Sequence, residues 1–215
     1  MKKILYEKFP KNNLKAKSIV VLLHGIGADG FDLISLAQLW GKIFKETQFY
    51  SLHAPYDYDL AEFGKQWFSL KDRDQTRILK EIELVKPLIF NFLDEKLKKN
   101  NIGFDKLVLV GFSQGTMISL NTGLSFETKI KGILGYSGGV ILTKSGKIDV
   151  KSKPNICLIH GNDDEVVPKK MMLTTKDILE EKAVSVESHI IPNLGHGIND
   201  EGVKIGIEFL NKNLI

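Results

Sequence analysis

The sequence of 215 residues contains a single cysteine and no long apolar run. One cysteine cannot form a disulfide within the chain, which argues against a small secreted domain held together by disulfides. No segment approaches the roughly 18 consecutive apolar residues of a membrane-spanning helix, so we expect no integral membrane segment. Cys157 itself lies in an apolar stretch, and we interpret it as a core residue rather than a nucleophile.

Arginine is almost absent, because Arg73 and Arg77 are the only two and lysine supplies every other basic side chain. The formal net charge is +4, and the basic residues are scattered along the chain. Nucleic-acid-binding surfaces usually concentrate basic residues and use the arginine fork for phosphate. The sequence therefore predicts no nucleic acid partner.

The N-terminal segment 1–7 carries basic residues but lacks the apolar stretch that follows them in a secretory signal. With 43% hydrophobic and 26% charged residues, the composition is typical of an ordinary globular protein. The length suits one domain, which we place at residues 1–215. We expect a cytoplasmic enzyme, and both a monomer and a homodimer stay open.

Apolar runs that predict buried strands alternate with segments of helical periodicity. One helical segment covers 78–93, where Pro87 is expected to kink or divide the helix. Apolar strands that alternate with helices predict an α/β fold, with a mainly parallel sheet covered by helices on both faces. Sites in such sheets form at the carboxyl ends of the strands. The predicted strands are 18–23, 49–52, 106–110, 130–136, 155–160 and 185–191.

A Gly111-x-Ser113-x-Gly115 segment lies between a predicted strand and a predicted helix, which is the pattern of a nucleophile elbow. Such a turn is so tight that its flanking side chains must be very small. It exposes the serine hydroxyl and points the positive end of the following helix at it. The alternative is an ordinary strand–helix turn with a capping serine. We take Ser113 as the candidate nucleophile.

A serine hydroxyl is a poor nucleophile until a base takes its proton, and His196, in a Gly-His-Gly segment after the last strand, suits that role. A carboxylate must then orient the imidazole. Asp163, Asp164 and Glu165 stand together after an earlier strand; Asp163 fits a turn cap equally well, and Glu165 fits a solvent-facing position. The chain order Ser113, Asp164, His196 is the order of α/β-hydrolases.

The glycine-rich segment 24–27 ends the first predicted strand. If the chain is a hydrolase, the backbone N–H of Ile26 forms one half of an oxyanion hole. The N–H of Gln114, the residue after the nucleophile, forms the other half.

The same region allows a different interpretation, because Gly25-x-Gly27-x-x-Gly30 is also a dinucleotide-binding fingerprint. That function needs an acid about 20 residues later to bind the ribose. The sequence has no acid there, and Asp29 would repel a pyrophosphate. A dinucleotide-binding oxidoreductase is therefore a minor alternative.

Four segments together resemble the phospholipase/carboxylesterase family, relatives of the acyl-protein thioesterases, and segment 66–74 is similar to a loop of its bacterial carboxylesterase branch. The resemblance spans about residues 20–210 and implies an α/β-hydrolase fold without a cap domain. We expect no cofactor. The four segments are 23–30, 111–116, 160–168 and 195–198.

The resemblance also implies roles for individual residues. It implies a triad of Ser113, His196 and Asp164, with Asp164 rather than Asp163 as the acid, and it places Ile26 and Gln114 in the oxyanion hole. Thr116 departs from the family pattern, because eukaryotic thioesterases typically have glycine there. This departure favours simple esterase activity over depalmitoylation of proteins.

Aromatic residues crowd the segment 54–74, which is long for a loop without periodicity and is expected to be functional. We expect these rings and residues near the strand ends to form an apolar groove for an acyl chain. The alternative is that the rings fill the core under the loop. The predicted groove residues are Phe63, Trp67, Phe68, Phe112, Met117 and Val166, with Trp67 favoured by the resemblance.

The predicted function is a serine hydrolase that cleaves short- to medium-chain acyl esters, with lysophospholipids and acyl thioesters as further candidate substrates. The alternative is a catalytically silent binding protein of the same fold. We expect no metal, because the five histidines show no paired ligand spacing.

Overall fold

The computed structural model describes residues 3–12 and 14–214. Outside it lie Met1, Lys2, Asn13 and Ile215. Both ends of the predicted domain and the first two residues of the N-terminal segment therefore fall outside the described residues. No helix of the described residues combines the length and the apolar character needed to cross a membrane.

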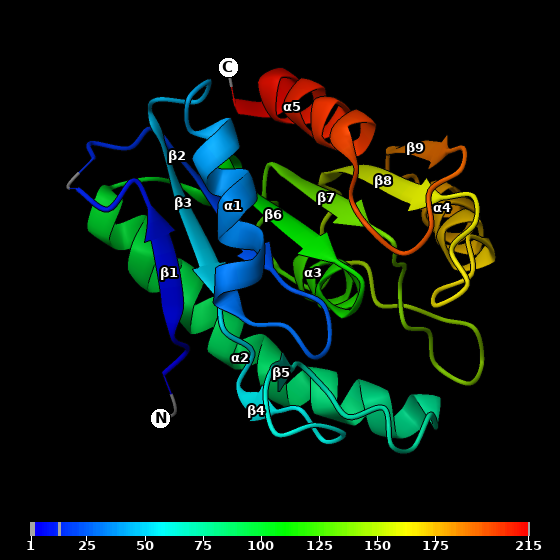
Figure 1. Cartoon of the computed structure of the whole chain (residues 1–215). Coiled ribbons are helices and arrows are strands. Elements are labelled where there is room, and N and C mark those ends of the chain that lie inside the picture. The colour runs from blue at the N-terminus through cyan, green and yellow to red at the C-terminus, as the bar shows by residue number, and fades with distance from the viewer. Residues whose placement is uncertain (1–2, 13, 215) are drawn as a thin grey trace.

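A seven-stranded sheet forms the centre of the molecule, in the order β1-β3-β2-β6-β7-β8-β9 (Figure 1). All neighbours pair in parallel except β1, which runs antiparallel to β3 at the edge. The sheet confirms the predicted mainly parallel α/β architecture. Its strands are β1 (Tyr6–Phe9), β2 (Ser18–Leu23), β3 (Thr47–Leu52), β6 (Leu107–Phe112), β7 (Gly132–Tyr136), β8 (Asn155–Gly161) and β9 (Val186–Ile191).

Helices cover both faces of the sheet (Figure 1). One apolar core lies under α1 and α5 and the other under α2, α3 and α4, because adjacent residues of each strand point to opposite faces. The helices are α1 (Gly30–Trp40), α2 (Gln75–Asn100), α3 (Gln114–Gly123), α4 (Lys170–Glu181) and α5 (Asp200–Leu214), and a 3-10 turn, η1 (Phe104–Lys106), precedes β6.

Three features differ from the sequence-based expectation. Pro87 does not divide α2, since Val85 and Ile89 on either side of it are buried and hold the helix against the core. The edge strand β1 was not predicted, because its sequence is short and mixed. The segment 54–74 contains a small hairpin, formed by β4 (Tyr56–Asp57) and β5 (Lys65–Gln66).

No separate cap domain covers the carboxyl edge of the sheet within the described residues.

Candidate active site

Four polar segments follow four strands at the carboxyl edge of the sheet. Ile26 follows β2, Ser113 follows β6, Asp164 follows β8 and His196 follows β9. Since parallel strands end at the same edge, segments up to 170 residues apart in sequence (from Ile26 to His196) meet there.

Ser113 adopts the strained backbone of a nucleophile elbow, with φ 53° and ψ −117°. A non-glycine residue with positive φ is costly and persists where the surrounding structure enforces it. Two glycines make this turn possible. A Cβ on Gly111 would overlap the backbone of Gly115 and Thr116, and a Cβ on Gly115 would overlap the carbonyl oxygen of Leu23.

The structure brings the three predicted triad residues into one hydrogen-bonded chain. Ser113 Oγ lies 3.0 Å from His196 Nε2, and His196 Nδ1 lies 2.8 Å from Asp164 Oδ2. A carboxylate only accepts hydrogen bonds, so Nδ1 carries the proton and Nε2 accepts from the serine hydroxyl. This tautomer leaves Nε2 able to take the Ser113 proton.

Asp164 is selected over its acidic neighbours by its surroundings. Its Oδ1 accepts from the backbone N–H groups of Val166 at 3.0 Å and Val167 at 2.9 Å. Burial acts to raise the pKa of Asp164, but the hydrogen bonds from His196 and these N–H groups outweigh it and lower the pKa below its usual value. Asp163 and Glu165 are exposed. Asp164 therefore stays a carboxylate, oriented at both oxygens.

His160 is a residue at this site that the sequence-based interpretation missed. Its buried Nε2 lies 2.7 Å from the Val167 carbonyl oxygen and 3.2 Å from Asp164 Oδ2. Both neighbours are acceptors, so Nε2 carries the proton and donates to them. Its Nδ1 is buried and finds no hydrogen-bond partner among the described residues. His160 thus supplies a second donor to the oxygen that His196 binds.

Close packing does not require the glycines on either side of His196. A Cβ on Gly197 would meet nothing within 4 Å, and one on Gly195 only the Asp163 oxygen at 3.9 Å. A Cβ on Gly161, at the end of β8, would instead overlap the carbonyl oxygens of Leu194 and Gly195. Gly161 is the residue that lets the His196 loop pack closely onto the sheet.

His24 is a second residue that was missed, and it fixes the loop that carries Ile26. Its Nδ1 donates to Gly25 O at 2.7 Å, and its Nε2 accepts from Ala54 N at 3.0 Å. Burial lowers the pKa of His24 to about 4, so the ring is neutral at pH 7 as this pattern requires. Both missed histidines end a buried strand and precede a glycine, and this shared His-Gly pattern was the available signal.

The backbone N–H groups of Ile26 and Gln114 donate no hydrogen bond within the described part of the chain. Gln114 is the first residue of α3, where an N–H has no partner inside the helix. The loop around Ile26 is held by Gly27, whose φ is 80° and whose N–H donates to Lys65 O at 2.8 Å. Both N–H groups are free to bind an anion.

The Gln114 side chain, unlike its backbone, binds the segment 54–74. Its Oε1 accepts from Trp67 N at 2.8 Å, and its Nε2 donates to Phe68 O at 2.7 Å. Trp67 Nε1 donates to His24 O at 2.9 Å. The segment is therefore fastened to the elbow and to the Ile26 loop at once.

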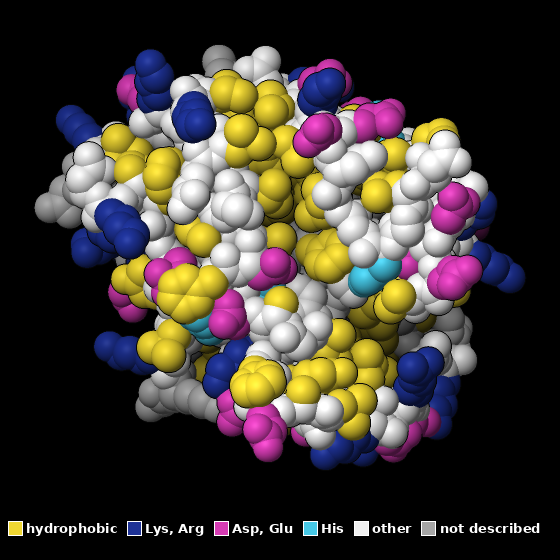
Figure 2. All heavy atoms as spheres, in the orientation of Figure 1, with side chains coloured by type: hydrophobic (Ala, Val, Ile, Leu, Met, Phe, Trp, Pro, Cys, Tyr) yellow, Lys and Arg dark blue, Asp and Glu magenta, His cyan; other side chains and the backbone are white. Residues whose placement is uncertain are grey.

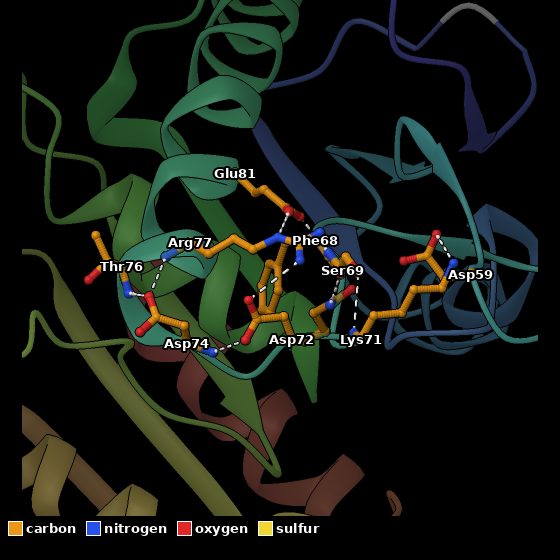
Figure 3. Close-up of polar contacts among 10 residues, drawn as sticks. Asp59, Phe68, Ser69, Lys71, Asp72, Asp74, Thr76, Arg77 and Glu81 are labelled. Atoms are coloured by element: carbon orange, nitrogen blue, oxygen red, sulfur yellow. Dashed lines mark hydrogen bonds and ion pairs between the residues drawn. The ribbon is translucent and has the colours of Figure 1, made fainter.

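A hydrogen bond and an ion pair attach the end of this segment to the start of α2 (Figure 3). Ser69 N donates to Glu81 at 2.6 Å, and Arg77 lies 3.6 Å from Asp72. Within the segment, Lys71 lies 3.6 Å from Asp59 of the hairpin. These contacts attach the segment to the body of the molecule.

Two of the predicted groove residues are buried and cannot line a groove. Trp67 and Phe68 have exposed fractions of 0%, so their rings belong to the core beneath the site and cannot contact a bound acyl chain. The sequence pattern could not separate the two cases, because aromatic rings suit both a groove and a core. The alternative interpretation, in which these rings fill the core under the loop, is the correct one for this pair.

The other four predicted groove residues lie in different places. Phe63 is 80% exposed beside the hairpin, and Val166 is 69% exposed two residues after Asp164. Met117 is half-buried against the core under α2, α3 and α4. The Phe112 ring lies on the other face, with its centroid 4.9 Å from that of His196.

Phe112 lines one of two clefts, and Pro168, two residues after Val166, lines the other. The second cleft, about 360 Å³, has walls that include Val140, Ile141, Leu142, Pro168 and Met171. We call it the acyl-side cleft, for the role that is proposed for it below. The α1–α5 cleft, about 320 Å³, lies between α1 and the start of α5, and its walls include Asp32, Leu33, Leu36, Phe112, Ile198 and Val203. Figure 2 shows apolar side chains gathered in a hollow over α1 and α5.

One group away from the site has the residue types of a metal ligand set, namely Cys157, Glu187 and His189. Burial raises the pKa of the Cys157 thiol to about 12, which opposes the thiolate that metals bind. Glu187 already pairs with His189 at 2.8 Å and with Lys212 at 3.5 Å. These contacts account for the group without a metal.

A dinucleotide fits the glycine segment poorly. Asp29 caps α1, and its carboxylate accepts from Phe31 N at 2.8 Å. A pyrophosphate would need that same helix N-terminus. The structure therefore gives no support to the oxidoreductase alternative.

This chain is similar to known esterases and thioesterases in sequence and in fold. Residues 7–214 match the family described as Phospholipase/Carboxylesterase. An acyl-protein thioesterase 1 from Gibberella zeae is 26% identical, over 91% of this chain and 90% of the relative. The crystal structure of esterase PE8 is 34% identical with a TM-score of 0.91 and covers 99% of this chain and 100% of that one. A Bacillus cereus carboxylesterase, 18% identical with a TM-score of 0.80 over 98% and 94% of the chains, shares the fold.

His24 makes stability depend on pH. In the unfolded chain the imidazole takes up a proton near pH 6.5, but in the folded chain only near pH 4, so the unfolded state binds more protons in between. We expect the free energy of unfolding to have its maximum contribution from His24 above pH 6.5. As the pH is lowered from there to pH 4, the free energy of unfolding should fall by on the order of 2–3 kcal/mol. Urea denaturation of wild type and His24→Gln at several pH values measures this, and equal slopes for the two proteins between those limits would contradict it.

Trp67 is expected to matter for stability rather than for acyl-chain preference. Trp67→Ala should lower the free energy of unfolding by roughly 3–5 kcal/mol, the usual cost of emptying a large buried aromatic site. Phe63→Ala, at the exposed ring in the same segment, is the matched control and should change it by less than about 0.5 kcal/mol. Equal stabilities of the two variants in urea would refute the core assignment.

His160 is expected to act as a positioning residue for Asp164. His160→Phe should lower kcat about tenfold with KM little changed, since a hydrogen bond to a charged group is lost. The acid limb of the kcat/KM profile should move to higher pH, because the Asp164 carboxylate, with one donor fewer, attracts the protonated ring of His196 more strongly. His160→Gln, whose side-chain amide can place an N–H near Asp164 Oδ2, should recover most of kcat and most of the wild-type pH profile. A His160→Phe enzyme with an unshifted profile would exclude this role.

Proposed function

The chain belongs to the phospholipase/carboxylesterase family and is an ester hydrolase, and from that premise we propose that Ser113, His196 and Asp164 cleave its substrates through an acyl-enzyme. One observation carries this proposal: the unbroken hydrogen-bonded chain from Ser113 Oγ through the His196 ring to Asp164, in which each proton has a defined acceptor.

In the first half of the reaction, Ser113 Oγ attacks the acyl carbonyl carbon while His196 Nε2 takes the hydroxyl proton. The carbonyl π electrons move to its oxygen, and Asp164 stabilises the imidazolium that results. When the tetrahedral intermediate collapses, the bond from carbon to the leaving oxygen or sulfur breaks. His196 gives its proton to the leaving atom, which departs as an alcohol or thiol.

The oxyanion of the intermediate binds to the N–H groups of Ile26 and Gln114. Both are unpaired within the described residues, and the N-terminus of α3 adds positive potential at Gln114. Because the Gln114 side chain and His24 hold the surrounding backbone in place, the two donors need no rearrangement when the charge develops.

In the second half, water replaces the leaving group on the His196 side. His196 takes a proton from the water, and the hydroxide adds to the acyl carbon. The ester bond to Ser113 breaks, and the serine recovers the proton as the carboxylic acid leaves.

For the acyl part we propose short- to medium-chain groups, carried as simple esters, lysophospholipids or thioesters. The acyl-side cleft supports this, because Val140, Ile141, Leu142 and Met171 give it an aliphatic wall and its volume of about 360 Å³ is modest. Met117 and Val166 are not among the residues that line this cleft, and they remain proposed contacts of the acyl chain.

The experiment compares hydrolysis of p-nitrophenyl butyrate by wild type and by Ser113→Ala. We expect wild type to turn over and the variant to lose at least about 1,000-fold in kcat, as removal of a triad nucleophile does. Ser119→Ala is the control, since this serine is buried on the same helix and its hydroxyl has no partner among the described residues. If Ser113→Ala kept near wild-type activity while folded by circular dichroism, the proposal would fail.

A further inference from the structure

The α1–α5 cleft adjoins the triad on one particular side. Phe112, in its wall, has its ring 4.9 Å from the His196 ring, and Gly197 and Ile198, also in the wall, directly follow His196. The cleft is therefore bounded by the two chain segments that carry the nucleophile and the base.

The chemistry of the proposed reaction assigns a direction to each part of the substrate. His196 Nε2 must return its proton to the leaving oxygen or sulfur, so the leaving group lies on the His196 side of Ser113. The carbonyl oxygen points to the Ile26 and Gln114 N–H groups. The acyl chain takes the remaining direction, and the proposed function assigns it to the acyl-side cleft, whose Val140 belongs to the core under α2, α3 and α4.

The α1–α5 cleft carries one formal charge. Asp32 is the only acidic or basic residue in its wall, and it pairs with no lysine, arginine or histidine among the described residues. Burial raises the pKa of Asp32, and repulsion by Asp29 raises it further. Asp32 is exposed in the first turn of α1, close to the carboxylate of the N-cap Asp29, so both negative charges would attract a cation bound in the cleft.

The rest of the wall suits an apolar cation. Leu33, Leu36 and Val203 provide aliphatic surface, and the Phe112 ring offers an aromatic face. A quaternary ammonium group gains from an aromatic face and a nearby carboxylate while its methyl groups contact aliphatic side chains. An anionic leaving group would meet only repulsion.

We propose that the α1–α5 cleft binds the leaving group of the substrate and that Asp32 makes the enzyme prefer esters and thioesters of cationic alcohols and thiols. This proposal rests on the proposed function, because it takes the direction of the leaving group from the role of His196.

The test uses two thioesters that share the acyl group and the thiol chemistry. S-butyrylthiocholine has a cationic leaving group, and S-(3,3-dimethylbutyl) thiobutyrate replaces its trimethylammonium group with the neutral tert-butyl isostere. Release of thiol is followed with a disulfide reagent for wild type, Asp32→Asn and Glu62→Gln. Glu62 is an exposed acid of the hairpin, and its variant controls for loss of one surface charge.

We expect wild type to favour the cationic thioester in kcat/KM by about three- to tenfold, the size of one partly screened charge interaction. Asp32→Asn should abolish that preference and leave kcat/KM for the neutral thioester within about twofold. Glu62→Gln should keep the preference.

Equal kcat/KM for the two thioesters in wild type, or a preference that survives Asp32→Asn, overturns the proposal. Turnover of p-nitrophenyl butyrate without turnover of either thioester also overturns it, while the proposed function stands. No turnover of any of the three esters by wild type removes the proposed function and this proposal together.

Discussion

The nucleophile, both proposed oxyanion donors and the loop 54–74 depend on how closely the start of α3 approaches the end of β2. Gly115 touches the Leu23 carbonyl so closely that any side chain there would overlap it. This contact sets Ser113 and the N–H of Gln114 beside the loop that carries Ile26. The Gln114 side chain then reaches the backbone of Trp67 and Phe68. A single backbone approach thereby couples the nucleophile, both proposed oxyanion donors and the long loop 54–74.

Two buried imidazoles support this arrangement from opposite ends. His24 bridges the Ile26 loop to Ala54, and His160 donates to Val167 and Asp164. Each ring works only with its protons in one arrangement, because its neighbours are fixed backbone groups or a carboxylate. Both rings are almost fully enclosed. Of the imidazoles at the site, His196 is the one whose Nε2 faces a hydroxyl, which is the condition for moving a proton to and from substrate.

The sequence was sufficient where local pattern decides structure and insufficient where distant segments decide it. Apolar strand runs and the Gly-x-Ser-x-Gly turn are local, and both were predicted correctly. The edge strand β1 depends on pairing with β3, about 40 residues away, so its own mixed sequence carried little signal. The choice of Asp164 over Asp163 could not come from spacing, since it depends on which carboxylate meets two backbone N–H groups and His196. Trp67 was wrongly placed in the groove because a buried and a ligand-facing tryptophan look identical in sequence.

Because Trp67 is buried, we expect the substrate to be recognised on the two faces of the sheet rather than by the loop 54–74. Phe112 points to the face under α1 and α5, and Met117 packs on the face under α2, α3 and α4, so Ser113 lies at the boundary between them. A substrate attached to Ser113 must extend over both faces. On the proposed mechanism, its acyl chain contacts the acyl-side cleft and its leaving group contacts α1 and α5. Because no residue lines both clefts, we expect a substitution in one cleft, away from Phe112 and the residues after His196, to alter one half of the substrate preference and to leave the other half unchanged.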